Sequence, residues 1–359
     1  MLIHIFEDTP HHYIPMSTFF STKCTLVQEQ EFWVRSKETC TKENGTPNPD
    51  GFFEYTNAAD LVKRLTEKSP ETTFVFHGLL DVNIIWRLLF SVIISRCSCV
   101  IWGYELYRYS QKKLPIKLII TKWLHRLLLS RFNKVINLTP GDAEILTQVL
   151  KRKTTTVLPY PGIGLTGLKV TPTKREDEQT IKIMVGNSAA SSNEHLDAFE
   201  SLKHLKEENI EIVVPLNYAG EQTYIKNVIS EGEKYFGEKF KPITNMLNKE
   251  EYDKLLEKID MTVFSHHRQQ GLYVVYAMLL MGKPVYMREG TSSYQNFISL
   301  GFSINPFESL ILTNIENISQ QIASNNLSNQ TLMNRHFTEE ALAPKWSLML
   351  NDLMPEHSC

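Results

Sequence analysis

The stretch Met184-Val-Gly-Asn-Ser-Ala-Ala-Ser-Ser-Asn-Glu-His195 decides the fold class of its half of the chain. The β-branched residues within 181–185 are typical of a buried strand, and Gly186 permits a sharp turn directly after it. Ser191 and Glu194 have the spacing of a capping box, which begins a helix. The sequence therefore predicts a strand, a tight turn and a helix, the repeating unit of a parallel α/β sheet.

This turn is also a candidate anion site. The N–H groups of a helix start have no partner within the helix, and they attract phosphate oxygens. We therefore predict donor-binding roles for the small and polar residues of the turn: Gly186, Asn187, Ser188, Ser192, Asn193 and Glu194. The alternative is an ordinary βα turn in which Ser and Asn side chains serve only as caps.

Strand and helix patterns alternate along both halves of the chain. We predict strands at residues 2–6, 32–34, 52–55, 74–76, 99–102, 135–138, 156–158, 181–185, 211–214, 241–244, 261–264 and 284–287. This pattern predicts two Rossmann-like α/β domains that face each other across a cleft. The expected domains are 1–165 and 180–335, joined by a Gly-rich and charged linker at 166–179 and followed by a C-terminal helix within 336–359 that crosses back to the first domain.

Polar residues follow three strands of the first half. They include His12 after the first strand, His77 and Asp81 after the strand at 74–76, and Glu105 after the strand at 99–102. The carboxyl ends of parallel strands form the ligand crevice of an open sheet, so these residues are candidate catalytic groups. His77 is favoured slightly as a base because imidazole titrates nearest to neutral pH. Each of the four also fits the common role of a helix cap or loop acceptor.

A second polar site follows the strand at 261–264, in Phe264-Ser-His-His-Arg-Gln-Gln-Gly271. Its Arg268 has the forked donor geometry that suits phosphate oxygens. A third loop follows the strand at 211–214, and its Tyr218 offers an aromatic ring on which a base could stack. The predicted donor-binding residues of these two loops are Asn217, Tyr218, Arg268, Gln269, Gln270 and Gly271. The three loops together predict a nucleotide diphosphate site without a P-loop.

One basic stretch stands out in a chain whose net charge is only −2. Residues 106–141 contain no Asp or Glu. We predict that the helix in this stretch contacts an anionic membrane surface through Lys112, Lys113, Lys117, Lys122, Trp123 and Arg126. The alternative is a surface helix that packs its apolar face on the sheet and leaves its bases in water.

Composition restricts the remaining classes. With 42% hydrophobic and 22% charged residues, the chain has the balance of a globular protein, and the near-neutral charge and absence of a known motif argue against nucleic-acid binding. The five cysteines lack C-x-x-C spacing, so we expect reduced thiols and no metal site. Neither a secretory signal nor a membrane span of about 18 apolar residues is expected.

Several segments resemble one bacterial family, the TDP-N-acetylfucosamine:lipid II transferases of GT-B type. They are Pro10-His-His12, Phe74-Val-Phe-His-Gly78, Ile101-Trp-Gly-Tyr-Glu-Leu-Tyr107, Val185-Gly-Asn-Ser188, Ser192-Asn-Glu-His195 and Arg268-Gln-Gln-Gly271. The resemblance covers both halves in the same order. It implies transfer of 4-acetamido-4,6-dideoxy-D-galactose from a dTDP donor to an undecaprenyl-diphosphate disaccharide in enterobacterial common antigen synthesis. It also implies a peripheral protein at the cytoplasmic face of the inner membrane.

The sequence departs from common GT-B patterns in one respect. Retaining members often carry Glu-x7-Glu in the second domain, whereas the segment from Gln270 to Met278 contains no carboxylate. The chain also lacks Asp-x-Asp, so we expect a metal-independent enzyme with no cofactor, in which Arg268 and helix starts stabilise the leaving diphosphate. Alternatives left open are a GT-B enzyme for another nucleotide sugar, a nucleotide-sugar epimerase and a non-catalytic sensor.

Overall fold

The fold is described from a computed structural model. It describes residues 1–7, 9–36, 47–48, 50–109, 113–153, 155–165, 168 and 180–353. The chain forms two compact units, Met1–Ile163 with Glu339–Cys359, and Gly164–Thr338. Each unit is an α/β sheet with helices on both faces, so the predicted class of two Rossmann-like domains is confirmed.

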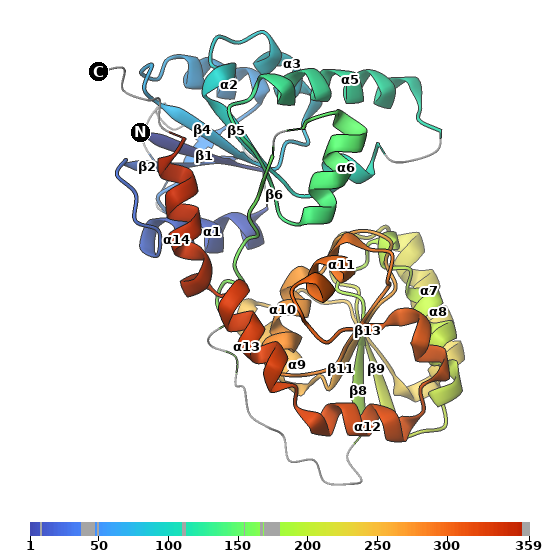
Figure 1. Cartoon of the computed structure of the whole chain (residues 1–359). Helices are drawn as coiled ribbons and strands as arrows, with labels where there is room; N and C mark the ends of the chain where they lie inside the picture. The colour runs from blue at the N-terminus through green and yellow to red at the C-terminus, as the bar shows by residue number, and fades with distance from the viewer. Residues whose placement is uncertain are drawn as a thin grey trace. The chain divides into compact units, whose positions relative to one another are not determined.

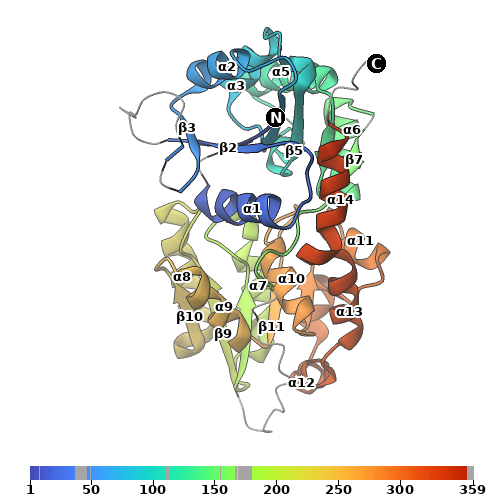
Figure 2. The ribbon, with the colours of Figure 1, turned by 90° about the vertical axis from the view of Figure 1, so that its left-hand side faces the viewer.

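The first unit contains a seven-stranded parallel sheet. Its order is β3 (Phe53–Tyr55), β2 (Gln30–Arg35), β1 (Leu2–Phe6), β4 (Thr73–His77), β5 (Cys97–Ile101), β6 (Val135–Asn137) and β7 (Thr156–Val157). Alternate strand residues enter two cores, as the two-residue period of a strand requires. One core packs under α2 (Ala58–Thr66), α3 (Val82–Leu89), α5 (Ile116–Arg131) and α6 (Pro140–Leu150). The other packs under α1 (Pro10–Thr22) and α14 (Glu339–Asn351), and Figure 2 shows α1 and α2 on opposite sides of the sheet.

The second unit contains a six-stranded parallel sheet. Its order is β10 (Phe240–Ile243), β9 (Ile210–Pro215), β8 (Ile181–Val185), β11 (Met261–Phe264), β12 (Val285–Met287) and β13 (Asn305–Pro306). One face is covered by α7 (His195–Leu202), α8 (Gln222–Phe236) and α12 (Ile315–Ser324). The opposite face is covered by α9 (Lys249–Lys258), α10 (Leu272–Leu280), α11 (Ser292–Ser299) and α13 (Leu327–His336), as Figure 1 shows.

The described residues also form short helices. They are α4 (Tyr104–Tyr107) and the 3₁₀ turns η1 (Ile94–Arg96), η3 (Ser191–Asn193), η4 (Lys203–Leu205), η5 (Gly237–Lys239) and η6 (Phe307–Leu312). The described part of the chain ends with two helices, α13 and α14, which Phe337 and Thr338 separate. Phe337 is buried in the core of the second unit, and Trp346 is buried in that of the first.

Candidate functional site

The strand order of the second unit reverses between β8 and β11, and the loops after both strands leave the same edge of the sheet. Ligands of open parallel sheets bind at such a reversal. Gly186 follows β8 with φ +68°, and a Cβ there would lie 2.9 Å from Asn193 Oδ1 and 3.0 Å from His195 Nε2. Gly271 precedes α10 with φ +68°, and its Cβ would lie 3.1 Å from Asn187 Oδ1. Both loops therefore need a glycine, which has no Cβ, at the point where they approach each other.

Asn193 folds the loop between β8 and α7. Its Nδ2 donates to the Ser188 carbonyl over 2.8 Å, and its Oδ1 accepts from the Asn187 N–H over 3.3 Å. The predicted capping box is wrong in the described part of the chain, because Ser191 begins η3 and not the helix. Glu194 lies directly before α7 in the left-handed region with φ 50° and makes no side-chain cap. The intervening 3₁₀ turn removes the spacing that a capping box needs.

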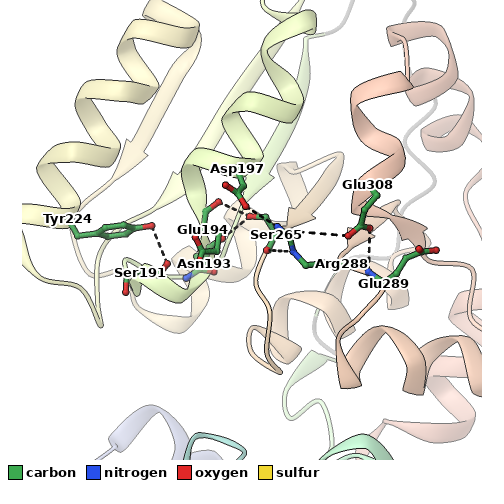
Figure 3. Close-up of polar contacts among 9 residues, drawn as sticks. All are labelled: Ser191, Asn193, Glu194, Asp197, Tyr224, Ser265, Arg288, Glu289 and Glu308. Carbon is green, nitrogen blue, oxygen red and sulfur yellow. Dashed lines mark hydrogen bonds and ion pairs between the residues drawn. The ribbon is translucent and has the colours of Figure 1, made fainter. Parts of the chain in front are cut away.

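A network of polar contacts joins the loops after β8, β11 and β12 (Figure 3). Ser265 Oγ, after β11, donates to the carbonyl oxygens of Asn193 over 2.8 Å and Glu194 over 2.9 Å. Arg288, after β12, donates from Nε to the Ser265 carbonyl over 2.7 Å. Its Nη2 lies 3.0 Å from Asp197 Oδ2 in the first turn of α7. Three loops from separate parts of the sequence are thereby fixed relative to one another.

Arg288 is a site residue that the sequence analysis missed. Its guanidinium lies 4.8 Å from the ring centre of Phe307, and its Nη1 is 3.9 Å from Glu308 Oε1. Desolvation, followed by the charges of Arg268 and Arg288, lowers the pKa of His266 to about 3. Two guanidinium groups therefore act on one buried neutral imidazole, although Asp197 and Glu308 offset the charge of Arg288. The available signal was its position immediately after a predicted strand, the rule that selected Arg268.

Arg268, Ser192 and Gln270 form a hydrogen-bonded chain. Arg268 Nη2 donates to Ser192 Oγ over 2.9 Å, and Ser192 Oγ donates to Gln270 Oε1 over 2.8 Å. These three predicted residues therefore come together from the loops after β8 and β11. Gln269 is 7% exposed and Gly271 is half-buried, on either side of Gln270.

Unpartnered polar atoms gather in these loops. Among the described residues, buried side-chain atoms without a hydrogen-bond partner include Asn187 Oδ1, His195 Nε2, Asn217 Oδ1, both ring nitrogens of His266, Gln269 Oε1 and Gln270 Nε2. A buried polar group that lacks a partner costs about 1–3 kcal/mol, so a concentration of them marks a place where other polar atoms bind. Asn217 and Tyr218 follow β9, and Asn187 Nδ2 donates to Tyr218 Oη over 3.0 Å.

The strand order of the first unit reverses between β1 and β4. Glu7 follows β1, and its carboxylate accepts from the N–H groups of Leu80 and Asp81. Burial, then the neighbouring Asp81 carboxylate, raises the pKa of Glu7 above its ordinary value, although Arg35 opposes this shift. Arg35 Nη1 lies 3.0 Å from Asp81 Oδ2, and Asp81 also caps α3 through the N–H of Asn83. The reversal point thus holds two carboxylates and one guanidinium.

His77 is fully buried in a chain of hydrogen bonds. Gln30 Nε2 donates to the Phe20 carbonyl, which leaves Gln30 Oε1 to accept from His4 Nε2 over 3.2 Å. His4 Nδ1 must then accept from His77 Nε2 over 2.9 Å. His77 Nδ1 in turn accepts from Tyr160 Oη over 2.6 Å. Burial holds the pKa of both imidazoles far below the usual range, and both nitrogens of His77 are occupied, which argues against direct proton abstraction by this residue.

Glu105 and His12 lie in contrasting surroundings. Glu105 is fully buried, and its Oε1 accepts from the N–H of Leu79 over 3.2 Å while Oε2 accepts from that of Trp102 over 3.1 Å. It therefore joins the loops after β4 and β5, and burial raises the pKa of this carboxyl. His12 is exposed in the first turn of α1, with its ring 5.0 Å from that of Trp102.

The basic helix α5 has apolar residues on two faces. Thr121, Leu124, His125, Leu128 and Leu129 are buried against the sheet. A second stripe of α5 is exposed. Beside it lie exposed residues of α3, which packs against α5, and the exposed residue Phe90 at the C-terminal end of α3. We call this set the α3–α5 surface: Val82, Trp86, Phe90, Ile116, Ile119, Ile120, Trp123 and Leu127. Lys113, Lys117, Lys122 and Arg126 lie on or beside α5, and Lys112 lies outside the described residues.

Solved structures of glycosyltransferases share this architecture. The chain matches sucrose-phosphate synthase from Thermosynechococcus elongatus with a TM-score of 0.74 and 10% identity, over 98% of this chain and 99% of that one. It matches a glycosyltransferase from Rickettsia africae ESF-5 with a TM-score of 0.70 and 11% identity, over 98% of both chains. At such identities the likeness shows the fold alone. The two Rossmann-like units and these neighbours define a GT-B fold.

The family follows from the sequence match. Residues 1–347 match the family described as 4-alpha-L-fucosyltransferase glycosyl transferase group 56, and the chain belongs to it. It is a glycosyltransferase, and the family transfers 4-acetamido-4,6-dideoxygalactose to a lipid-linked acceptor in enterobacterial common antigen synthesis. Family membership sets aside the epimerase and sensor alternatives. Within the described residues, no helix is long and apolar enough to cross a membrane, and no group of three or more metal-ligating side chains occurs.

Proposed function

We propose that the second unit binds the dTDP-sugar donor at the reversal between β8 and β11. The observation that carries this proposal is the concentration of unpartnered buried polar atoms beside Arg268 and Arg288. The diphosphate supplies acceptor oxygens for the guanidinium of Arg268 and for the first N–H groups of α7. Charge that develops on the leaving diphosphate is stabilised by these fixed donors, which need no metal ion.

The first unit binds the lipid-linked disaccharide at the reversal between β1 and β4. Among the four residues predicted as bases, His77 and Glu105 are fully buried, whereas His12 is exposed and the Asp81 side chain is 13% exposed. Asp81 and the neighbouring Glu7 form the carboxylate pair that an acceptor hydroxyl reaches from the edge of the sheet. The raised pKa of Glu7 moves this carboxyl toward the range in which a general base operates near neutral pH.

The α3–α5 surface holds the protein on the inner membrane, where a polyprenyl-diphosphate acceptor resides. Trp86 and Trp123 are 51% and 60% exposed, and aromatic side chains favour the membrane interface. The stretch 106–141 supplies bases without a single acid, which complements anionic headgroups. At about 1 kcal/mol for each base near such a surface, Lys113, Lys117, Lys122 and Arg126 contribute a few kcal/mol to binding.

Two measurements test the donor and acceptor assignments. Calorimetric titration with dTDP should give saturable binding, and UDP or GDP should compete more weakly. Product should form from dTDP-4-acetamido-4,6-dideoxygalactose only when the polyprenyl-diphosphate acceptor is present. Absence of dTDP binding would reject the donor site, and stronger binding of another nucleotide would replace dTDP as the donor.

Vesicle sedimentation tests the membrane surface. Wild type should bind vesicles that contain anionic phosphatidylglycerol and bind poorly to vesicles of phosphatidylcholine alone. Trp86→Ser with Trp123→Ser should reduce binding to the anionic vesicles at least tenfold. The matched control is Leu312→Ser, which removes an apolar side chain that is 86% exposed in the second unit. Equal effects of the control and the double variant would reject the assignment.

A further inference from the structure

The amide of Gln270 has an orientation that its neighbours fix. A guanidinium only donates hydrogen bonds, so Ser192 Oγ accepts from Arg268 Nη2 and directs its own hydrogen to Gln270 Oε1. The amide nitrogen of Gln270 is therefore the atom left over. It is buried, and it has no hydrogen-bond partner among the described residues. The two N–H groups of this amide can therefore donate hydrogen bonds to a ligand in the site proposed for the dTDP-sugar.

An unpartnered acceptor oxygen lies close to the residue that follows Gln270. Asn187 Nδ2 donates to Tyr218 Oη over 3.0 Å, which leaves Asn187 Oδ1, and this oxygen lacks a partner in the described part of the chain. It lies 3.1 Å from the position of a Cβ on Gly271, the residue next to Gln270. Gln269 is only 7% exposed, and its side chain offers a further unpartnered oxygen. The site therefore presents unpartnered donors and unpartnered acceptors together.

A diphosphate cannot satisfy this set. Its oxygens accept hydrogen bonds from Arg268 and from the N–H groups of α7, but they cannot donate to Asn187 Oδ1. A secondary amide can, since it has one N–H donor and one carbonyl acceptor. The donor sugar of this family carries one such group, the acetamido substituent at C4.

We infer that Gln270 and Asn187 recognise the acetamido group of the donor sugar, the Gln270 nitrogen donating to its carbonyl and the Asn187 oxygen accepting from its N–H. This inference rests on the proposed donor site. Ser192 acts as a positioning residue, because it holds the Gln270 amide in the required orientation. A hydroxyl at C4 lacks both the carbonyl oxygen and the N–H of the acetamido group, so we expect the pair to discriminate between the two sugars.

The test compares two donors and the bare nucleotide. Gln270→Leu keeps most of the side-chain volume and removes both the carbonyl oxygen and the NH2 group of the amide. It should lower kcat/KM about tenfold for dTDP-4-acetamido-4,6-dideoxygalactose and leave it within about twofold for dTDP-6-deoxygalactose, which has a hydroxyl at C4. The Kd for dTDP should not change. Gln320→Leu makes the same substitution on the exposed surface of α12 and should leave kcat/KM unchanged for both donors.

A second variant separates recognition from folding. Ser192→Ala frees the Gln270 amide to rotate, and it should lower the preference for the acetamido donor by a smaller factor in the same direction. Equal loss with both sugars, or a weaker dTDP complex in Gln270→Leu, would overturn the inference. Unchanged selectivity in Gln270→Leu would also overturn it while leaving the donor site intact. Failure of the wild type to bind dTDP would instead reject the proposed function.

Discussion

Replacement of Arg268 by alanine should weaken donor binding far more than acceptor binding. Arg268 is partly buried in the loop between β11 and α10, and its Nη2 already donates to Ser192. A hydrogen bond between charged groups contributes about 1.5–3 kcal/mol, and each 1.4 kcal/mol is a factor of ten. The Kd for dTDP should therefore rise roughly 10- to 150-fold. The full donor should lose more than dTDP does, because Ser192 and Gln270 also lose their fixed arrangement.

Calorimetry with dTDP and with the intact donor measures donor affinity, and the KM for the lipid-linked acceptor reports on acceptor binding. Arg268→Lys keeps the charge but not the fork, so it should recover part of the affinity. Arg335→Ala removes an exposed arginine near the end of α13 and serves as the matched control. An equal loss of donor and acceptor affinity in Arg268→Ala, or no loss of either, would refute the placement of the diphosphate.

Three further predictions concern stability. Gly186→Ala should destabilise the protein and weaken dTDP binding, because the added Cβ meets Asn193 and His195. In Gly237→Ala, at φ +55°, the added Cβ has nothing within 4 Å, so this control carries only the backbone strain of about 1–2 kcal/mol. Equal melting temperatures of the two variants would contradict the prediction. Glu105→Ala leaves two buried N–H groups unpaired and should lower the free energy of unfolding by about 3 kcal/mol in urea titrations, and a loss below about 1 kcal/mol would count against the assigned role. Buried imidazoles with lowered pKa values stay neutral in the folded state and gain protons on unfolding below pH 6.5. The free energy of unfolding should therefore fall by about 1.4 kcal/mol for each of them between pH 7.5 and pH 5.5. A urea midpoint that stays constant over this range would argue against the prediction. These imidazoles are those of His4, His77, His125, His195 and His266.

Local sequence patterns were sufficient for most of the two sheets. The β-branched run that ends at Val185 and the turn at Gly186 are strong signals, because strand propensity and a positive φ are local properties. The short strand β13 and the break between α13 and α14 were missed. Each depends on which core buries the segment, and that is settled by residues distant in the sequence.

The candidate residues were less predictable than the fold. Arg268, Ser192 and Gln270 were all selected because they follow strands, but the direction of their hydrogen bonds emerges only when the loops after β8 and β11 meet. His77 was favoured as a base from its ordinary pKa. Its burial against His4 and Tyr160 could not be inferred from the sequence, since the three residues come from separate segments.

The sequence by itself determined the alternation of strands and helices, the small-residue turn after β8 and the acid-free basic stretch. These are local features, set by side-chain periodicity, backbone freedom and charge. Only the tertiary structure decided that β8 lies beside β11, that Arg288 joins their loops, and that α3 extends the exposed apolar face of α5. Strand order results from long-range pairing and burial, so the residues that share a site cannot be read from their spacing along the chain.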